Sequence, residues 1–168
     1  ENMNMLLESL SFATDMRVLM LSHNGIGTRE SISAAPALVS SLSVMKNLKE
    51  LYLSRSELLD EDLEPFFDIL PCFVELEYLG IAFNRLTMKS ITKIASMAPD
   101  LKSLVRLPLT NNNFGVRTAD FTESILLLLE YSQVCELGFD SFDTKVWAAL
   151  KRNRIRRKTL LEMSQLKD

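Results

Sequence analysis

The sequence predicts a single α/β domain of 168 residues, folded as a curved solenoid of about five strand-and-helix repeats. Two observations lead to this fold class. A short apolar-x-apolar phrase recurs roughly every 28 to 32 residues. Between successive phrases, apolar residues return at helical spacing, as at Leu38, Leu42 and Met45. A strand and a one-sided helix cannot bury their own apolar faces, whereas stacked copies bury them together.

The phrase consists of two apolar residues separated by one position, followed by a small residue and often by asparagine. In a strand, alternate side chains point the same way. We therefore expect Leu51 and Leu53 to face the core, and Glu50, Tyr52 and Ser54 to face outward. The equivalent apolar pairs are Leu19 and Leu21, Leu79 and Ile81, Leu107 and Leu109, and more weakly Leu137 and Phe139.

Three of the phrases are followed by an asparagine, namely Asn24, Asn84 and Asn112. Where a strand ends, backbone amides and carbonyls lose their ladder partners, and an asparagine side chain offers both a donor and an acceptor. We expect these side chains to satisfy the turns in a stacked ladder. Ser56 and Phe142 interrupt the ladder, so the turn at Ser56 is expected to be looser.

The pattern as a whole resembles leucine-rich repeats over roughly residues 4–153. The period near 28 resembles the ribonuclease-inhibitor-like class. This resemblance implies a leucine-rich-repeat solenoid with a right-handed coil, in which parallel strands line the concave face and helices form the convex face. It also implies that the domain binds another protein.

We expect residues 1–168 to form one domain. Residues 1–15 are predicted to be the helix of a preceding partial repeat, 16–143 the repeats and 144–168 a C-terminal helical cap. The first helix has no strand before it. We therefore expect the N-terminal edge to be covered by another element, or by part of a longer chain or a larger complex.

The C-terminal cap is predicted to hold two helices, over 144–152 and 155–166. In the first, Val146, Trp147 and Leu150 are expected to face inward. Packing in the last repeat is the favoured role for Trp147, with a binding hot spot as the alternative.

The net charge, the apolar runs and the cysteines limit the classes of protein to which this chain can belong. The net charge is −3 and the pI about 5.3, so the whole chain is not expected to attract nucleic acid. The most apolar run, 125–129, is too short to span a membrane. Cys72 and Cys135 are expected to be buried free thiols in a reducing compartment. We therefore predict a cytoplasmic, intracellular protein.

The sequence offers no set of residues for catalysis, and we predict no enzyme activity, no cofactor and no metal. His23 is the only histidine, so zinc has no ligand set. No Gly-x-Ser-x-Gly nucleophile motif or glycine-rich phosphate loop occurs. His23 is therefore expected to be a surface residue.

Two charged runs allow more than one interpretation. Acidic residues between Glu57 and Glu64 are expected to meet the dipole at a helix start, or to form an acidic docking patch. The run Lys151–Lys158 holds six basic residues in eight. It is expected to be a solvated helix face, with partner docking, nuclear import or nucleic-acid binding as alternatives.

The outward strand residues are predicted to form the binding surface. Large aromatic side chains beside small residues such as Gly80 and Pro108 suit a protein partner. The alternatives are that the aromatic residues pack only on each other, or that the register is shifted by one. Pro108 lacks an N–H group, so a local distortion is expected there. The predicted partner-binding residues are Met20, Glu50, Tyr52, Tyr78, Phe83, Arg106, Glu136 and Asp140.

The predicted function is a protein–protein interaction module or scaffold that binds a protein partner through its concave face. The resemblance also implies an alternative, a regulator of a GTPase or of the cytoskeleton. Relatives of this repeat class include a Ran GTPase-activating protein and the actin-capping tropomodulins. A further alternative is nucleic-acid or nuclear-import contact through the basic run, with a nuclear location.

Overall fold

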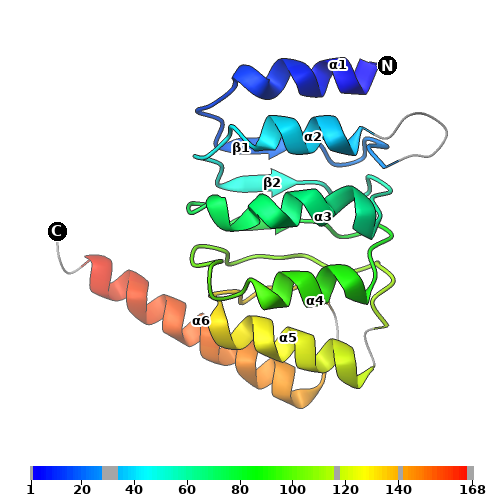
Figure 1. The fold of residues 1–168 in the computed structure, drawn as a ribbon. Coiled ribbons are helices and arrows are strands. Elements are labelled where there is room, and N and C mark those ends of the chain that lie inside the picture. The colour runs from blue at the N-terminus through cyan, green and yellow to red at the C-terminus, as the bar shows by residue number, and fades with distance from the viewer. Residues whose placement is uncertain (1, 28–33, 116–117, 140–141, 166–168) are drawn as a thin grey trace.

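The computed structural model describes residues 2–27, 34–115, 118–139 and 142–165, and shows a layer of helices packed on one side of a small parallel sheet (Figure 1). The sheet has three strands in the order β1-β2-β3. The strands are β1 (Val18–Met20), β2 (Glu50–Tyr52) and β3 (Tyr78–Gly80). Both neighbouring pairs are parallel.

The helices follow one another along the layer, each packing on the next (Figure 1). Two short 3-10 segments continue the first and third helices, at Leu10–Phe12 and Leu70–Cys72. The α-helices are α1 (Asn2–Ser9), α2 (Ala35–Leu42), α3 (Asp60–Ile69), α4 (Met88–Ser96), α5 (Ala119–Tyr131) and α6 (Thr144–Gln165).

The predicted leucine-rich-repeat solenoid of about five repeats is wrong. Across the described ranges the molecule has six α-helices and a three-stranded sheet, not five strand-and-helix units. The phrases at Leu107 and Leu137 form no strand. They contribute only isolated parallel bridges, from Tyr78 to Arg106 and from Arg106 to Glu136.

Backbone chemistry explains where the sheet ends. Pro108 has no N–H group, so it cannot donate to the strand before it. In the following phrase, Gly138 adopts a left-handed conformation with φ of 75°. In the earlier phrases, the N–H of the second apolar residue donates to the carbonyl of the residue between the apolar pair of the next phrase. By this rule the Leu109 N–H should donate to Gly138. It donates instead to the carbonyl of Leu137, at 2.9 Å. Regular pairing therefore stops after β3.

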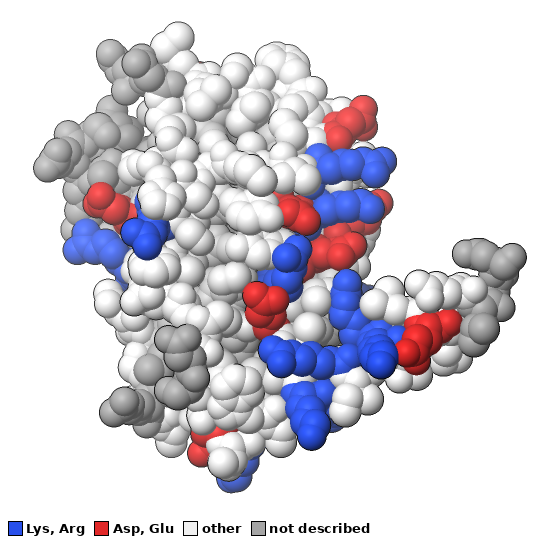
Figure 2. All heavy atoms as spheres, turned by 180° about the vertical axis from the view of Figure 1, so that it is seen from behind, with Lys and Arg blue, Asp and Glu red and all other residues white. Residues whose placement is uncertain are grey.

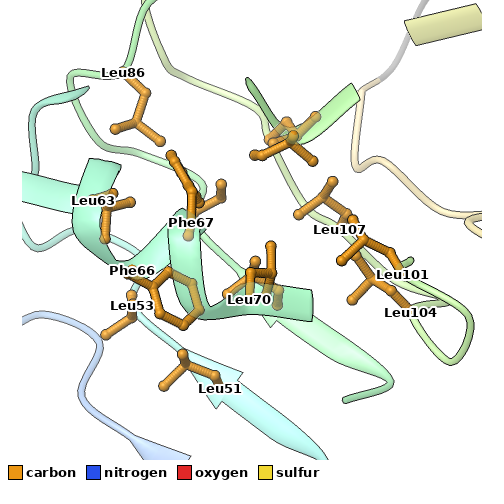
Figure 3. Packing of buried hydrophobic residues seen from close by; sticks show 14 of the residues in the cluster. Leu51, Leu53, Leu63, Phe66, Phe67, Leu70, Leu86, Leu101, Leu104 and Leu107 are labelled. Carbon is orange, nitrogen blue, oxygen red and sulfur yellow. The ribbon is translucent and has the colours of Figure 1, made fainter. Parts of the chain in front are cut away.

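The core lies between the sheet and the helices. Leu51 and Leu53 are fully buried and lie beside Phe66 of α3 (Figure 3). The equivalent residues Leu79 and Ile81 are also fully buried. Each fully buried large apolar side chain contributes about 1.5–3 kcal/mol to folding, so this inner layer holds the sheet and helices in register.

Asparagine side chains satisfy the turns after the strands, as predicted. The Asn84 side chain accepts from the N–H groups of Ser56 and Leu58 at 3.0 and 3.2 Å. It donates to the carbonyls of Leu53 and Ile81, both at 3.0 Å. The turn at Ser56 differs from the others, because both Arg55 and Glu57 have positive φ.

The C-terminal prediction of two helices is wrong, because α6 is one continuous helix of 22 residues. Val146 and Leu150 are buried, but Trp147 is 42% exposed and not inward. The second half of α6 projects away from the body (Figure 1). The expectation of buried thiols is also wrong, since Cys72 is exposed and Cys135 only partly buried.

Candidate protein-binding surface

The candidate site lies on the sheet face opposite the helices, which we call the open face. The strand register places side by side those residues that hold the same position in successive apolar-x-apolar phrases. Glu50 pairs with Tyr78, Tyr78 is bridged to Arg106, and Arg106 to Glu136. These four predicted binding residues therefore form one row across the molecule. Charged side chains gather along one side of the face seen from behind (Figure 2).

Three residues of this row and the predicted binding residue Tyr52 form a connected group, which we call the tyrosine–arginine cluster: Glu50, Tyr52, Tyr78 and Arg106. The rings of Tyr52 and Tyr78 stack with centroids 4.3 Å apart. The Tyr52 hydroxyl donates to Glu50 Oε2 at 2.5 Å. The Arg106 guanidinium lies 4.8 Å from the centroid of the Tyr78 ring. It also lies 3.5 Å from Glu50 Oε1.

Both phenols of the cluster stay protonated at neutral pH. The hydrogen bond to Glu50, with burial adding to it, raises the pKa of Tyr52. Burial raises the pKa of Tyr78, although the charge of Arg106 opposes this. The cluster is therefore a rigid surface of aromatic rings with one cation and one carboxylate, and it is suited to binding.

Of the remaining predicted residues, Met20 and Glu136 border the cluster, since Met20 pairs with Tyr52 and Glu136 is bridged to Arg106. Met20 is 69% exposed on β1, and Glu136 lies at the end of the row. Phe83 is 42% exposed and has positive φ, in a turn beside the strands. Asp140 lies outside the described residues. Tyr52 and Tyr78 do pack on each other, but not only on each other, because Tyr52 also contacts Glu50 and Tyr78 also contacts Arg106.

Two further residues of this surface were not among the predicted partner-binding residues. Arg55 lies over the Phe83 ring, with its guanidinium carbon 4.1 Å from the centroid. Gly80 leaves the space that the Tyr78 ring occupies, because a Cβ there would lie 2.8 Å from Tyr78 Cε1. Arg55 and Phe83 hold the same position in neighbouring phrases, so the sequence did give a signal for this pairing. Gly80 was expected to lie beside the aromatic residues, but as a small residue suited to a partner and not as space filled by Tyr78.

The acidic run on the helix side has a structural role. Asp60, only 9% exposed, accepts from the backbone N–H of Thr87 at 3.0 Å and from its hydroxyl at 2.5 Å. It also accepts from the Ser90 hydroxyl at 2.5 Å. Burial opposes ionisation, but the hydrogen bonds from Ser90 and Thr87 outweigh it and lower the pKa of Asp60. Asp60 thus joins the starts of α3 and α4.

Three of the six basic residues in the run on α6 contact other parts of the molecule. Arg152 donates to the carbonyl of Leu129 at 3.0 Å, and Arg154 to that of Cys135 at 3.2 Å. Arg157 pairs with Glu77 at 3.5 Å. Positive charge beside these carbonyls is favourable because they end helix α5 and the turn after it. The expected solvated helix face therefore describes the run only in part, because these three residues contact the body of the molecule.

Other kinds of site find little support in the described part of the chain. No group of three or more His, Cys, Asp and Glu side chains there is arranged to hold a metal ion. His23 is exposed, in a turn. In the same ranges, no helix combines the length and apolar character needed to cross a membrane.

No family model matches the sequence, and none of the curated proteins compared with it is similar. Solved structures do share the fold. The tropomodulin C-terminal domain from Caenorhabditis elegans has a TM-score of 0.81 at 13% identity, covering 100% of both chains. The leiomodin-1 actin-binding site 2 has a TM-score of 0.74 at 18% identity, over 98% of this chain and 96% of that one.

A more distant match is to the Mex67:Mtr2 subunits from Chaetomium, with a TM-score of 0.53 at 20% identity, over 88% of this chain and 98% of that one. The predicted assignment to the ribonuclease-inhibitor-like class is therefore wrong. The fold of this chain is that of tropomodulin and leiomodin C-terminal domains.

Proposed function

We propose that this chain is a non-enzymatic protein-binding domain of the actin cytoskeleton, and that its partner docks on the open face at the tyrosine–arginine cluster. The observation that carries the site is the cluster itself. Two stacked tyrosines, an arginine and a glutamate are joined on a surface that solvent still reaches. Tyrosine and arginine are enriched among residues that dominate protein–protein binding energy.

The choice of actin as partner rests on the fold. One neighbour is described as an actin-binding site, and the fold likeness extends over nearly the whole of both chains. An actin partner implies an intracellular location, which forms part of the proposal. Of the two functional alternatives suggested by the sequence, a GTPase regulator and a cytoskeletal regulator, the neighbours favour the second.

The chemistry of the cluster suggests what it contacts. Arg106 offers a planar cation whose side chain is 42% exposed, and Glu50 an acceptor that is 31% exposed. The tyrosine rings are already stacked, so little side-chain entropy is lost on binding. A partner surface with an apolar group beside a carboxylate fits this arrangement, because the carboxylate can pair with Arg106.

Co-sedimentation with actin filaments, together with a monomeric-actin binding assay by fluorescence, tests the proposal. We expect the wild-type domain to bind one form of actin. Substituting Tyr52→Ala with Tyr78→Ala is expected to weaken binding by about 2 kcal/mol or more. Tyr131→Ala is the matched control, since Tyr131 is 55% exposed on α5, outside the cluster. Absence of binding to both forms of actin would refute the choice of partner.

A further inference from the structure

We infer that one face of helix α6 extends the open face and binds an acidic segment of the partner protein. Its residues are Trp147, Lys151, Arg154 and Lys158, and we call it the α6 basic face. The inference rests on the open face as the docking surface of the proposed function, but it does not depend on actin as the partner.

The spacing of these four residues places them on one side of the helix. An α-helix turns through about 100° per residue, so the side chains four, seven and eleven positions after Trp147 point in nearly the same direction as Trp147 itself. All four residues are exposed. Val146 and Asn153, by contrast, are buried against the body. The side of α6 that carries these cations is therefore not the side that packs on the molecule.

Two hydrogen bonds show where the α6 basic face points. Arg152, on the other side of the helix, donates to the carbonyl of Leu129 in α5 at 3.0 Å. Arg154 donates through Nε to the carbonyl of Cys135 at 3.2 Å. Cys135 directly precedes Glu136, the last residue of the open-face row. The α6 basic face therefore continues the open face beyond Glu136, on the side away from α5.

This position argues for the partner protein as the source of the acidic segment. A stable protein–protein interface involves about 20–30 residues on each partner, whereas the tyrosine–arginine cluster holds only four. A partner seated on the cluster therefore has to cover neighbouring surface as well. Along the row, the next surface after Glu136 is the α6 basic face.

The cations of this face have little competition from carboxylates within the molecule. Among the described residues, neither Lys151 nor Arg154 forms an ion pair. Lys158 pairs only with Glu162 at 3.8 Å, and these side chains are 79% and 60% exposed, so the pair contributes little. Figure 2 shows lysine and arginine side chains gathered where α6 leaves the body. Charge complementarity therefore selects an acidic ligand.

The surroundings of the face favour an acidic protein segment over nucleic acid. Two carboxylates border it, namely Glu136 of the open face and Glu77, which pairs with Arg157 at 3.5 Å. A nucleic acid carries a charge at every phosphate, so these carboxylates would repel its backbone. A protein segment carries its carboxylates at separate positions, and it can place them against Lys151 and Arg154 alone.

Trp147 adds an apolar contact at one end of the face. It is 42% exposed, and its ring lies edge-on to that of Phe142 with centroids 5.8 Å apart. Phe142 thus supports the ring while solvent still reaches it. Tryptophan is enriched among the residues that dominate binding energy. The ligand is therefore an acidic segment that also carries an apolar side chain.

The test titrates the ¹⁵N-labelled 168-residue chain with a short synthetic peptide in which glutamates flank one leucine. Trp147 is the only tryptophan of the chain, so its fluorescence reports binding at this face, and NMR locates the site. We expect a change in Trp147 emission and amide shifts centred on residues 147–158. A control peptide with glutamine in place of each glutamate is expected to bind about tenfold more weakly or less.

Matched charge reversals on two sides of α6 separate this face from the overall charge of the helix. Lys151→Glu with Lys158→Glu reverses two exposed cations of the face, and we expect it to weaken peptide binding about tenfold. Lys145→Glu with Arg156→Glu makes the same change of charge at exposed positions on the opposite side of the helix. This control is expected to stay within about twofold of the wild type. Thermal unfolding of both variants verifies that the domain still folds.

Four results would overturn the inference. One is a wild-type chain without amide shifts at residues 147–158, and another is an equal loss of affinity in the two charge-reversal variants. The third is tighter binding of a thymidine oligonucleotide of the same total charge, which would make nucleic acid the ligand. The fourth is self-association, seen by sedimentation and abolished by Lys151→Glu with Lys158→Glu, which would make a second copy the occupant. Because peptide binding is measured without actin, failure here leaves the choice of actin standing, and the reverse also holds.

Discussion

The ring of Tyr78 stacks on that of Tyr52 at an interplanar angle of 29°, and the same ring fills the space above Gly80. An aromatic pair of this kind is worth about 0.5–1.5 kcal/mol beyond its buried area. The position of the Tyr78 ring thus depends on its neighbour in β2 and on the missing side chain two residues along its own strand.

Gly80→Ala is therefore expected to displace the Tyr78 ring from its stack on Tyr52. A Cβ at residue 80 would lie 2.8 Å from Tyr78 Cε1 and 2.9 Å from its hydroxyl oxygen. We expect the substitution to lower the free energy of unfolding by about 1 kcal/mol, measured by urea denaturation.

A double-mutant cycle identifies the cause of this loss. In a Tyr78→Ala background the added methyl group meets no ring, so Gly80→Ala is expected to become neutral or slightly stabilising. An equal cost in both backgrounds would show that Gly80 is required by the backbone instead.

Asn84→Ala is expected to be among the most destabilising substitutions in the turns that follow the strands. Asn84 is 7% exposed, and its loss leaves two backbone N–H groups and at least two carbonyls without a partner. We expect a loss of about 3 kcal/mol in urea denaturation. Asn24→Ala is the matched control, since Asn24 is only partly buried. It is expected to cost about 1 kcal/mol, and equal costs would contradict the ladder argument.

The inward leucines and the asparagine turns were predictable because each depends on spacing alone. Parallel pairing of the first three phrases followed from the same spacing. The end of the sheet after β3 was not predictable in this way. The phrases at Leu107 and Leu137 keep the apolar pattern, while Pro108 and Gly138 alter the backbone that should form the ladder. The spacing of apolar residues predicts which side chains are buried, but it does not predict which backbone groups form hydrogen bonds.

For the candidate site, the sequence predicted which residues lie in one row, since residues of equal phrase position pair in register. It did not predict how their side chains turn toward one another. The stack of Tyr52 on Tyr78 and the position of Arg106 over Tyr78 depend on side-chain rotamers. Those rotamers depend in turn on which neighbour is small, here Gly80.

Asp60→Asn is expected to remove a pH-dependent part of the stability. The pKa of Asp60 is lowered in the folded state. Its stabilising contribution is therefore complete above the usual aspartate pKa of about 3.9, and it is lost as the pH falls through the lowered value. At pH 7, where the contribution is complete, the variant is expected to be about 1.5–3 kcal/mol less stable than the wild type.

Urea denaturation at several pH values between 7 and 2.5 measures this effect. The difference between wild type and Asp60→Asn is expected to shrink as the pH falls. Asp68→Asn provides the control, because Asp68 pairs with Lys93 at 2.7 Å but its side chain is 59% exposed. An exposed pair contributes about 0–1 kcal/mol. A pH-independent difference for Asp60→Asn would contradict the role of its charge.

Asn153→Ala is expected to loosen the attachment of α6. This side chain is 2% exposed and donates to the carbonyls of Leu129 and Val134 at 2.9 and 2.8 Å. Without it, one buried carbonyl in the last turn of α5 and one after the helix lose a donor, at a cost of about 2–3 kcal/mol in unfolding free energy. The predicted helices over 144–152 and 155–166 leave Asn153 in a break between them. The structure instead uses Asn153 inside a continuous helix to hold the preceding turn.

Amide hydrogen exchange distinguishes this local role from a general loss of stability. In Asn153→Ala, amides of residues 146–153 are expected to exchange faster than those of β2 and β3, because α6 opens before the sheet does. Arg156→Ala, an exposed substitution three residues further along the helix, is expected to change stability by less than about 0.5 kcal/mol. If exchange increased equally in α6 and the sheet, Asn153 would stabilise the whole fold, and α6 would not be a separately opening element.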